Sequence, residues 1–298
     1  MPTRKPDSIT TYLNEAEARE LARRLYEAGY RLEGAGPAFR AEGQDVKATR
    51  YPTGSLLVQG RATRMFVEQF LKDIVGARYD EPAVGSDEAG KGDYFGPLVV
   101  AAVWVDRWAA ETLLEEGVQD SKKLSDAAAG RMAVEIEASC PHSVVSIGPQ
   151  RYNELHDGMR NVNKILAWAH ARAIENVLAK RAAGSVITDK FAPDRVVREA
   201  LMERGRKARL VQKTRAEREL PVAAASILAR ARFLRDLEAL EKKFNLRLPK
   251  GATHVEEAGR RFVKTHGEEK LRLVAKLHFK TTGRILAGRQ LDLEDQWQ

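Results

Sequence analysis

Two apolar stretches joined by a glycine-rich loop constrain the fold of this chain more than any other feature. Residues 84–87 and 97–106 have the short, mainly apolar composition of buried β-strands, and residues 90–96 between them contain three glycines. Glycine disfavours helix, so we expect a strand, an irregular loop and a second strand. Two adjacent acids, Asp87 and Glu88, stand at the end of the first strand, directly before the loop.

From about residue 83 onward, strands and helices are expected to alternate. Further short apolar runs predict strands at residues 143–147, 186–189 and 208–212. Longer segments predict helices at residues 163–181 and 222–244, the second with an apolar face at helical spacing: Ile227, Ala231, Leu234 and Leu237. This alternation predicts an α/β domain.

The first 78 residues have a different pattern, which predicts a small α+β unit. Asn14 and Glu17 have the spacing of a capping box, at the start of a helix that Gly29 ends. Strands are expected at residues 38–42, 45–51 and 55–59, followed by a second helix at residues 63–75. We therefore expect an N-terminal domain at residues 1–78 and a second domain at residues 79–298, which begins with a linker at residues 79–83.

Side chains of the expected N-terminal sheet alternate between its two faces. Val46 and Ala48 point to one face, which the helices should cover, whereas Lys47 and Tyr51 point to the other. Together with Arg40, these residues offer positive charge and an aromatic ring to a phosphate backbone. An ordinary solvated face explains the same pattern nearly as well.

Acidic residues mark the ends of the expected strands in the α/β domain. Asp87 and Glu88 end one strand, Asp189 ends another, and Glu217 follows a third. Open α/β sheets place their chemistry at such strand ends. Converging carboxylates repel one another unless a cation neutralises them, and hard cations such as Mg²⁺ prefer carboxylate oxygens. The pattern therefore suits two-metal hydrolysis of a phosphodiester.

The glycine-rich loop also resembles a nucleotide-binding P-loop. Gly85, Gly90 and Lys91 reproduce most of that spacing, but Gly92 stands where a hydroxyl residue is required. Asp87 and Glu88 would repel the phosphates, and the loop leads into a strand where a P-loop leads into a helix. We therefore reject a P-loop.

A different interpretation of the loop is contact with a nucleic-acid strand. Gly90 and Gly92 let the backbone approach closely, since glycine has no Cβ atom, and backbone groups can read a ribose 2′-hydroxyl. Lys91 is expected to contact phosphate, and Tyr94 to stack or pack beside the sugar.

At the level of motifs, the chain resembles the type 2 ribonucleases H, and within them the bacterial ribonuclease HIII family. Residues 87–97 match the signature of these enzymes, and their ending Asp93-Tyr94-Phe95-Gly96-Pro97 favours ribonuclease HIII over ribonuclease HII. Further matches are Asp120-Ser121-Lys122-Lys123-Leu124, Asn161, Asn163, His170, Asp189-Lys190-Phe191-Ala192-Pro193, residues 222–230 and Lys276-Leu277-His278-Phe279-Lys280. Together they span about residues 84–284.

The resemblance implies four metal-binding, catalytic acids, which fall on Asp87, Glu88, Asp189 and Glu217. The interval from Glu217 to Ser226 is about one residue shorter than in the family, so Glu219 remains an alternative fourth acid. Two Mg²⁺ or Mn²⁺ ions are implied as cofactors. The implied reaction cuts the RNA strand of an RNA/DNA hybrid and leaves 5′-phosphate and 3′-hydroxyl ends.

The family also implies a ribonuclease H-like fold, a mixed sheet flanked by helices, with an N-terminal domain like the TATA-box-binding protein. Ser121 and Lys122 are implied substrate contacts beside the loop residues. Two rival functions remain: cleavage at single ribonucleotides in DNA, as by ribonuclease HII, and hybrid binding without catalysis. The six histidines show no metal-binding spacing, and we assign none of them to metal.

Composition agrees with a nucleic-acid partner without requiring one. The net charge is +8, which suits a polyanion, although many proteins are this basic. The single cysteine, Cys140, excludes an internal disulfide framework, and we expect it to be a small buried hydrophobe. With no apolar signal segment and no long apolar run, we expect a cytoplasmic protein that does not enter membranes. Nothing in the sequence suggests more than a monomer.

Overall fold

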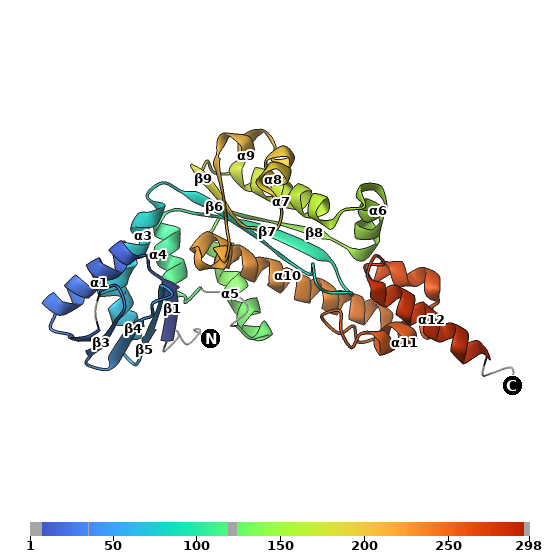
Figure 1. The fold of residues 1–298 in the computed structure, drawn as a ribbon, viewed down its shortest axis with the longest axis horizontal. Helices are drawn as coiled ribbons and strands as arrows, with labels where there is room; N and C mark the ends of the chain where they lie inside the picture. The colour runs from blue at the N-terminus through green and yellow to red at the C-terminus, as the bar shows by residue number, and fades with distance from the viewer. Residues whose placement is uncertain (1–7, 35, 119–123, 295–298) are drawn as a thin grey trace.

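The computed structural model describes residues 8–34, 36–118 and 124–294, and within these it contains two β-sheets. The first is antiparallel, with strand order β1-β5-β4-β3-β2, and the second is mixed, with order β10-β9-β6-β7-β8. The first sheet lies at one end of the molecule, and the C-terminal helices α11 and α12 lie at the other (Figure 1). The expected small α+β unit and larger α/β unit are both confirmed.

The N-terminal sheet has two more strands than the sequence predicts. The expected strands are β3 (Phe39–Gly43), β4 (Val46–Arg50) and β5 (Ser55–Gln59), and the additional ones are β1 (Ser8–Tyr12) and β2 (Arg31–Glu33). Both additional strands are edge strands, and β2 has only three residues. Edge strands of this kind bury too few side chains to produce a clear alternation.

Two helical segments cover one face of this sheet. The first is α1 (Glu15–Glu27), and its capping box is confirmed, because the Glu17 amide donates to Asn14 and the Asn14 amide donates to Glu17. The second is the expected helix at residues 63–75, which contains a π-helical turn. It comprises α2 (Thr63–Phe66), the π-turn Val67–Leu71, α3 (Lys72–Gly76) and a final 3₁₀ turn, Ala77–Tyr79. As expected, Val46 and Ala48 are buried on the covered face.

The mixed sheet contains all the strands predicted for it. They are β6 (Ala83–Ala89), β7 (Leu98–Val105), β8 (His142–Ile147), β9 (Ser185–Asp189) and β10 (Arg209–Lys213). β6 pairs antiparallel with β7 and parallel with β9, and β9 pairs parallel with β10. The carboxyl ends of β6, β9 and β10 therefore lie at the same edge of the sheet.

Helices cover both faces of the mixed sheet (Figure 1). Strand β7 contributes Leu98, Val100 and Ala102 to one core, and Val99, Ala101 and Val103 to the other. Helix α7 (Val162–Leu178) packs on the first side and α10 (Leu220–Phe244) on the second. The remaining helices are α4 (Arg107–Glu115), α5 (Asp126–Ser139), α6 (Pro149–Met159), α8 (Asp194–Ala200), α9 (Glu203–Lys207), α11 (Glu256–His266) and α12 (Lys280–Glu294).

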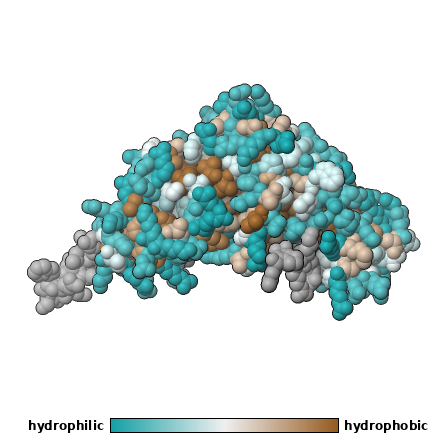
Figure 2. All heavy atoms as spheres, turned by 180° about the vertical axis from the view of Figure 1, so that it is seen from behind, coloured by the Kyte–Doolittle hydropathy of each residue, from teal (hydrophilic) through white to brown (hydrophobic). Residues whose placement is uncertain are grey.

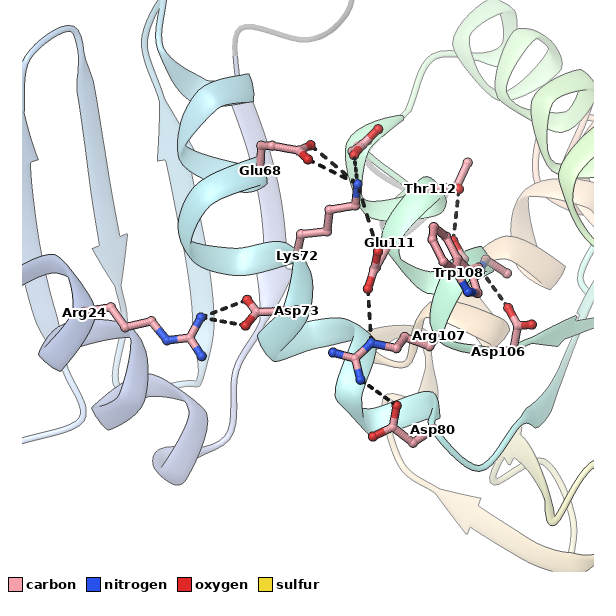
Figure 3. Close-up of polar contacts among 12 residues, drawn as sticks. Arg24, Glu68, Lys72, Asp73, Asp80, Asp106, Arg107, Trp108, Glu111 and Thr112 are labelled. Atoms are coloured by element: carbon pink, nitrogen blue, oxygen red, sulfur yellow. Dashed lines mark hydrogen bonds and ion pairs between the residues drawn. The ribbon is translucent and has the colours of Figure 1, made fainter. Parts of the chain in front are cut away.

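The apolar core continues from one sheet to the other. Ile74 and Val75 of α3 belong to the same buried cluster as Leu113 and Leu114 of α4. Polar contacts border this junction, including an ion pair of 2.7 Å between Lys72 and Glu115. Another, of 2.9 Å, joins Arg107 and Asp80 (Figure 3). Tyr79, at the first position of the expected linker, is only 2% exposed. The expected linker therefore starts inside the packed junction.

The face of the molecule that Figure 2 shows is mostly hydrophilic. Seen from behind, apolar residues reach the surface only in patches among polar ones (Figure 2). In the part of the chain that the structure describes, no helix combines the length and apolarity needed to cross a bilayer. Cys140 is buried, as expected, and burial raises the pKa of its thiol to about 11.

Candidate active site

The parallel strands bring the four expected acids to one cavity. Asp87 and Glu88 lie near the end of β6, and Asp189 is the last residue of β9. Because Ser86 pairs with Thr188, the next residues of the two strands lie at the same level. Glu217 follows β10 in a 3₁₀ turn, Ala216–Arg218. All four acids line a cavity of about 390 Å³.

The N-terminal part of helix α10 forms one wall of this cavity. Val222 and Ser226 line it, and Ala223, Ala224 and Ala225 are buried behind them. A Cβ atom on Gly85 would lie 2.2 Å from the carbonyl carbon of Pro221, so the helix backbone rests directly on β6. The small residues of α10 therefore allow the close packing against the acid-bearing strand that the sequence suggests.

Asp87 lies in an environment that disfavours its charge. Burial and the nearby Glu88 carboxylate raise the pKa of Asp87 to about 7, and hydrogen bonds from Ser226 and the Glu88 amide act in the opposite direction. A carboxyl in such a position binds a proton readily at neutral pH. A bound cation would reverse this preference, because positive charge stabilises the carboxylate.

Glu88 is stabilised as a carboxylate by a histidine. Burial acts to raise the pKa of Glu88, but the hydrogen bond and charge of His170, together with the charge of Lys91, hold it below its usual value. Nε2 of His170 lies 3.2 Å from Oε2 of Glu88, and Nδ1 lies 2.9 Å from Oγ of Ser86. Since a carboxylate only accepts, Nε2 carries the proton and donates a hydrogen bond to Glu88.

The sequence identifies His170 only as a family match, without a role beside an acid. It lies in α7, far along the chain from Glu88, and its ring stacks on Phe191 at a centroid distance of 4.5 Å. Sequence reasoning also gave no role to Arg230, Phe233 and Lys250, which line the cavity. Local pattern carries no signal for such neighbours, because only the tertiary fold brings them together.

The structure distinguishes the two alternatives for the fourth acid. Glu217 lines the cavity with the other three acids. Glu219 is directed elsewhere, because its carboxylate pairs with Lys213 at 2.6 Å and accepts from the Tyr79 hydroxyl at 3.4 Å. The geometry therefore favours Glu217.

Within the glycine-rich loop, the three residues expected to contact substrate lie in different environments. Lys91 is exposed and its amine lies 3.7 Å from Glu88, so it remains available at the cavity mouth. Gly92 is also exposed, and a Cβ atom at this position would meet nothing within 4 Å. Gly90 has φ +87°, and its Cβ would lie 2.2 Å from the Pro97 carbonyl oxygen, so the loop itself requires glycine there.

The position of Tyr94 contradicts the expectation that this residue stacks or packs beside a sugar. Its side chain is fully buried, and its hydroxyl lies 3.1 Å from Oγ1 of Thr282, so it does not stack or pack against a sugar in this structure. The ring instead contacts the rings of Phe95 and Phe279. An aromatic residue next to an exposed loop is therefore part of the core that anchors the loop.

The substrate contacts expected on the N-terminal unit do not line the cavity that contains the acids. Arg40 and Tyr51 are exposed on the N-terminal unit, and Lys47 forms an ion pair with Glu42. The expected open face is thus present. Ser121 and Lys122 lie outside the described residues.

A second cavity, of about 360 Å³, joins the N-terminal sheet to the acids. Its lining includes Glu217, which is shared with the first cavity. The other lining residues come from β1, from the turn into β5, from the segment after α4 and from the segment around Arg218: Thr10, Thr11, Tyr12, Thr53, Ser55, Val118, Arg215, Arg218, Leu220 and Ala223. The sequence did not indicate this junction.

The four acids are of the ligand type that a hard divalent cation prefers. Among the described residues, no group of three His, Cys, Asp or Glu side chains already converges closely enough to hold an ion. The four acids nevertheless supply only carboxylate oxygens, the donors that Mg²⁺ and Mn²⁺ prefer. The pKa of Asp87 is raised because burial and the Glu88 carboxylate disfavour its charged form, and a bound cation would stabilise that form.

Comparisons with known proteins agree with this site. The family model described as ribonuclease HII matches residues 84–282. Ribonuclease HIII of Protochlamydia amoebophila is 37% identical over 293 residues, covering 94% of this chain and 97% of that protein. Ribonuclease HIII of Chlamydia pneumoniae is 41% identical over 264 residues, covering 84% and 88%.

Solved structures show the same relationship. The crystal structure of Bst-RNase HIII in complex with Mn²⁺ has a TM-score of 0.69 and 32% identity, covering 94% of this chain and 98% of that chain. The crystal structure of Aquifex aeolicus RNase H3 has a TM-score of 0.56 and 28% identity, covering 91% and 100%. The expected ribonuclease H-like fold with its N-terminal unit is confirmed. The chain therefore belongs to the ribonuclease HIII family, within the type 2 ribonucleases H.

Proposed function

We propose that the chain is a metal-dependent endonuclease that hydrolyses the RNA strand of RNA/DNA hybrids and leaves 5′-phosphate and 3′-hydroxyl ends. The observation that carries this proposal is the convergence of Asp87, Glu88, Asp189 and Glu217 on one cavity, in a chain of this family. A solved relative, Bst-RNase HIII, was crystallised with Mn²⁺. For this chain we propose two ions, either Mg²⁺ or Mn²⁺.

The same four acids would hold the ions. When bound, the ions would activate a water molecule and stabilise the charge on the attacking and leaving oxygens. Asp87 must lose its proton to become a ligand, and His170 holds the Glu88 carboxylate in a fixed orientation by donating to it. Lys91 is placed to contact a phosphate, and the exposed backbone at Gly92 allows a ribose to approach.

Hybrid binding is proposed to involve both parts of the chain. Residues 79–298 form the proposed catalytic domain and residues 1–78 the proposed substrate-binding domain. Arg40, Lys47 and Tyr51 of the open face would contact the backbone of the hybrid, which gives affinity with little sequence preference. We further propose a monomer in the cytoplasm, where a reducing environment suits the free thiol of Cys140.

Two end-labelled duplexes test the activity. One carries at least four consecutive ribonucleotides within DNA, and the other carries a single ribonucleotide. Cleavage of the run alone, with Mg²⁺ or Mn²⁺, is the expected result. Efficient cleavage of both substrates would favour the ribonuclease HII-like alternative, and cleavage of neither would favour a protein that binds hybrids without cutting them.

The site assignment is tested by Asp87→Asn. The variant keeps the shape of the side chain but loses a ligand charge, so it should bind the hybrid and lose cleavage. Metal-dependent cleavage at the wild-type rate would refute the assigned site.

A further inference from the structure

The short turn that carries Glu217 is closed by two backbone hydrogen bonds of its own, from the Arg218 amide to Arg215 and from the Glu219 amide to Ala216. It is a single 3₁₀ turn between Arg215, at a left-handed φ of 59°, and the start of α10. On the side of the acids, the Ala216 amide donates to Oδ1 of Asp189 at 3.3 Å. On the other side, helix α10 begins at Leu220 with no side-chain cap from Glu219. The first turn of α10 therefore needs an acceptor for its free amides from outside this segment.

Tyr79, the last residue of the helical segment that leaves the N-terminal unit, is that partner. Its hydroxyl accepts from the Leu220 amide at 3.2 Å and donates to the Glu219 carboxylate at 3.4 Å. The Leu220 amide belongs to the first turn of α10, where amides have no acceptor within the helix. Burial and the nearby Glu219 charge raise the pKa of Tyr79, so the hydroxyl keeps its proton and can donate. One buried hydroxyl thus fixes the residues two and three positions after Glu217.

A second contact from the N-terminal unit holds the residue next to Glu217. The guanidinium of Arg218 lies over the ring of Tyr12 at 4.9 Å and donates to the Thr53 carbonyl oxygen at 3.4 Å. These contacts border the second cavity, which Glu217 also lines. The N-terminal unit and the adjoining residue Tyr79 therefore together contact three consecutive residues, 218–220, directly after the fourth acid.

Tyr79 itself is held firmly in place. The preceding Arg78 donates to the Glu17 carboxylate and to the Tyr12 carbonyl oxygen, both at 2.5 Å. The following Asp80 pairs with Arg107 of α4 at 2.9 Å (Figure 3). Tyr79 is thus an anchored residue at the junction of the two sheets, and movement of its hydroxyl requires movement of the junction.

We infer that Tyr79 is a positioning residue that sets the location of the Glu217 carboxylate, so that the junction with the N-terminal unit supports metal binding as well as substrate binding. This inference rests on the proposed role of Glu217 as a metal ligand. Tyr79 does not line the cavity that contains the acids. Its effect on cleavage must therefore pass through the turn at residues 216–220.

The test is Tyr79→Phe, which removes only the hydroxyl, with Tyr26→Phe as the control. Tyr26 is 74% exposed on α1 and lies outside the junction. We expect Tyr79→Phe to lower kcat about 3- to 10-fold, as for loss of one or two hydrogen bonds. The Mg²⁺ concentration at half-maximal rate should rise, while KM and the Kd for the hybrid stay unchanged. The control should match the wild type in all four quantities.

A double variant separates positioning from a general loss of packing. Single-turnover rates are compared at saturating Mn²⁺ for Tyr79→Phe, Glu217→Gln and the combination. If Tyr79 acts through Glu217, Tyr79→Phe lowers the wild-type rate and adds no further loss to Glu217→Gln. Multiplicative losses, an unchanged rate for Tyr79→Phe, or an effect on KM alone would overturn the inference.

Two controls keep the result decisive. If Tyr79→Phe has a strongly lowered Tm, Arg218→Met replaces it, since this change removes the contacts to Tyr12 and Thr53 and should give the same kcat and Mg²⁺ signature. Wild-type metal dependence in that variant would overturn the inference. Wild-type cleavage by Glu217→Gln would instead refute the proposed role of Glu217, so the two failures are distinguishable.

Discussion

The imidazole of His170 connects Glu88 to Ser86, with Nε2 at 3.2 Å from the carboxylate and Nδ1 at 2.9 Å from the hydroxyl. The ring is almost completely buried and stacks on Phe191. A carboxylate held in this way loses rotational freedom before any cation arrives. The ring thus pre-orients one of the proposed metal ligands without itself lining the cavity.

Replacing His170 with Gln should weaken metal binding. Glutamine donates to Glu88 less rigidly and loses the stacking on Phe191, and removal of such a supporting partner typically lowers metal affinity about 10- to 100-fold. The half-saturating Mg²⁺ concentration for hybrid cleavage measures the effect. His254→Gln, at an exposed position, is the matched control. Identical Mg²⁺ dependence in the two variants would contradict the supporting role.

The raised pKa of Asp87 predicts how stability depends on pH without metal. The folded state binds the Asp87 proton up to about pH 7, whereas an unfolded aspartate releases it near pH 4. The contribution of Asp87 to the free energy of unfolding is therefore fully present below about pH 4 and is lost as the pH rises through 7. In EDTA at pH 8, Asp87→Asn should be more stable than the wild type by about 1–4 kcal/mol.

Thermal unfolding of both proteins between pH 4 and 8 checks this prediction. The difference in Tm should shrink towards pH 4, and Mg²⁺ or Mn²⁺ at pH 8 should raise the Tm of the wild type more than that of Asp87→Asn. Parallel pH profiles for the two proteins would mean that Asp87 titrates normally.

Alanine at Gly90 and alanine at Gly92 should affect different properties, the first the stability of the fold and the second the binding of the hybrid. Gly90→Ala places a Cβ atom at φ +87° and 2.2 Å from a backbone oxygen, so it should destabilise the fold by about 2 kcal/mol or more. Gly92→Ala meets nothing within 4 Å and should leave Tm within about 1–2 °C of wild type. If the substrate backbone approaches Gly92, this variant should instead raise KM for the hybrid. A stable Gly90→Ala, or Gly92→Ala with an unchanged KM, would contradict these assignments.

Lys276→Met should loosen the same loop from the other side. The amine of Lys276 is fully buried and donates to the carbonyl oxygens of Asp93 and Gly96 at 2.8 and 2.7 Å. Methionine leaves both oxygens without this donor, which should cost about 2–4 kcal/mol in the free energy of unfolding. Denaturant titration measures the loss, with exposed Lys264→Met as the control. Equal stability of the two variants would show that water replaces the amine easily.

The sequence predicts the mixed sheet and its acids because buried strands leave a strong local signal. Each of the central strands is a short apolar run, and the acids stand directly at their ends, so strand direction alone brings Asp87 and Asp189 together. The edge strands β1 and β2 leave no such signal. Strand β2 has one partly buried residue, Leu32, between two exposed ones.

The environment of the acids depends on contacts between distant segments. His170 reaches Glu88 across 82 positions, and Tyr79 reaches Leu220 across 141. The burial of Tyr94 depends in the same way on residues near the C-terminus, including Phe279 and Thr282. Local periodicity contains no information about such pairs, which explains why the sequence predicts Tyr94 at the surface and Tyr79 in a linker.

The shared core between α3 and α4 has a thermodynamic consequence. Unfolding of the N-terminal sheet would expose Ile74 and Val75, and with them Leu113 and Leu114 on the other side of the junction. Exposure of apolar area on both sides adds to the free energy of any partly unfolded state. Such states are therefore sparsely populated, and both sheets should melt together in one cooperative heat-absorption peak.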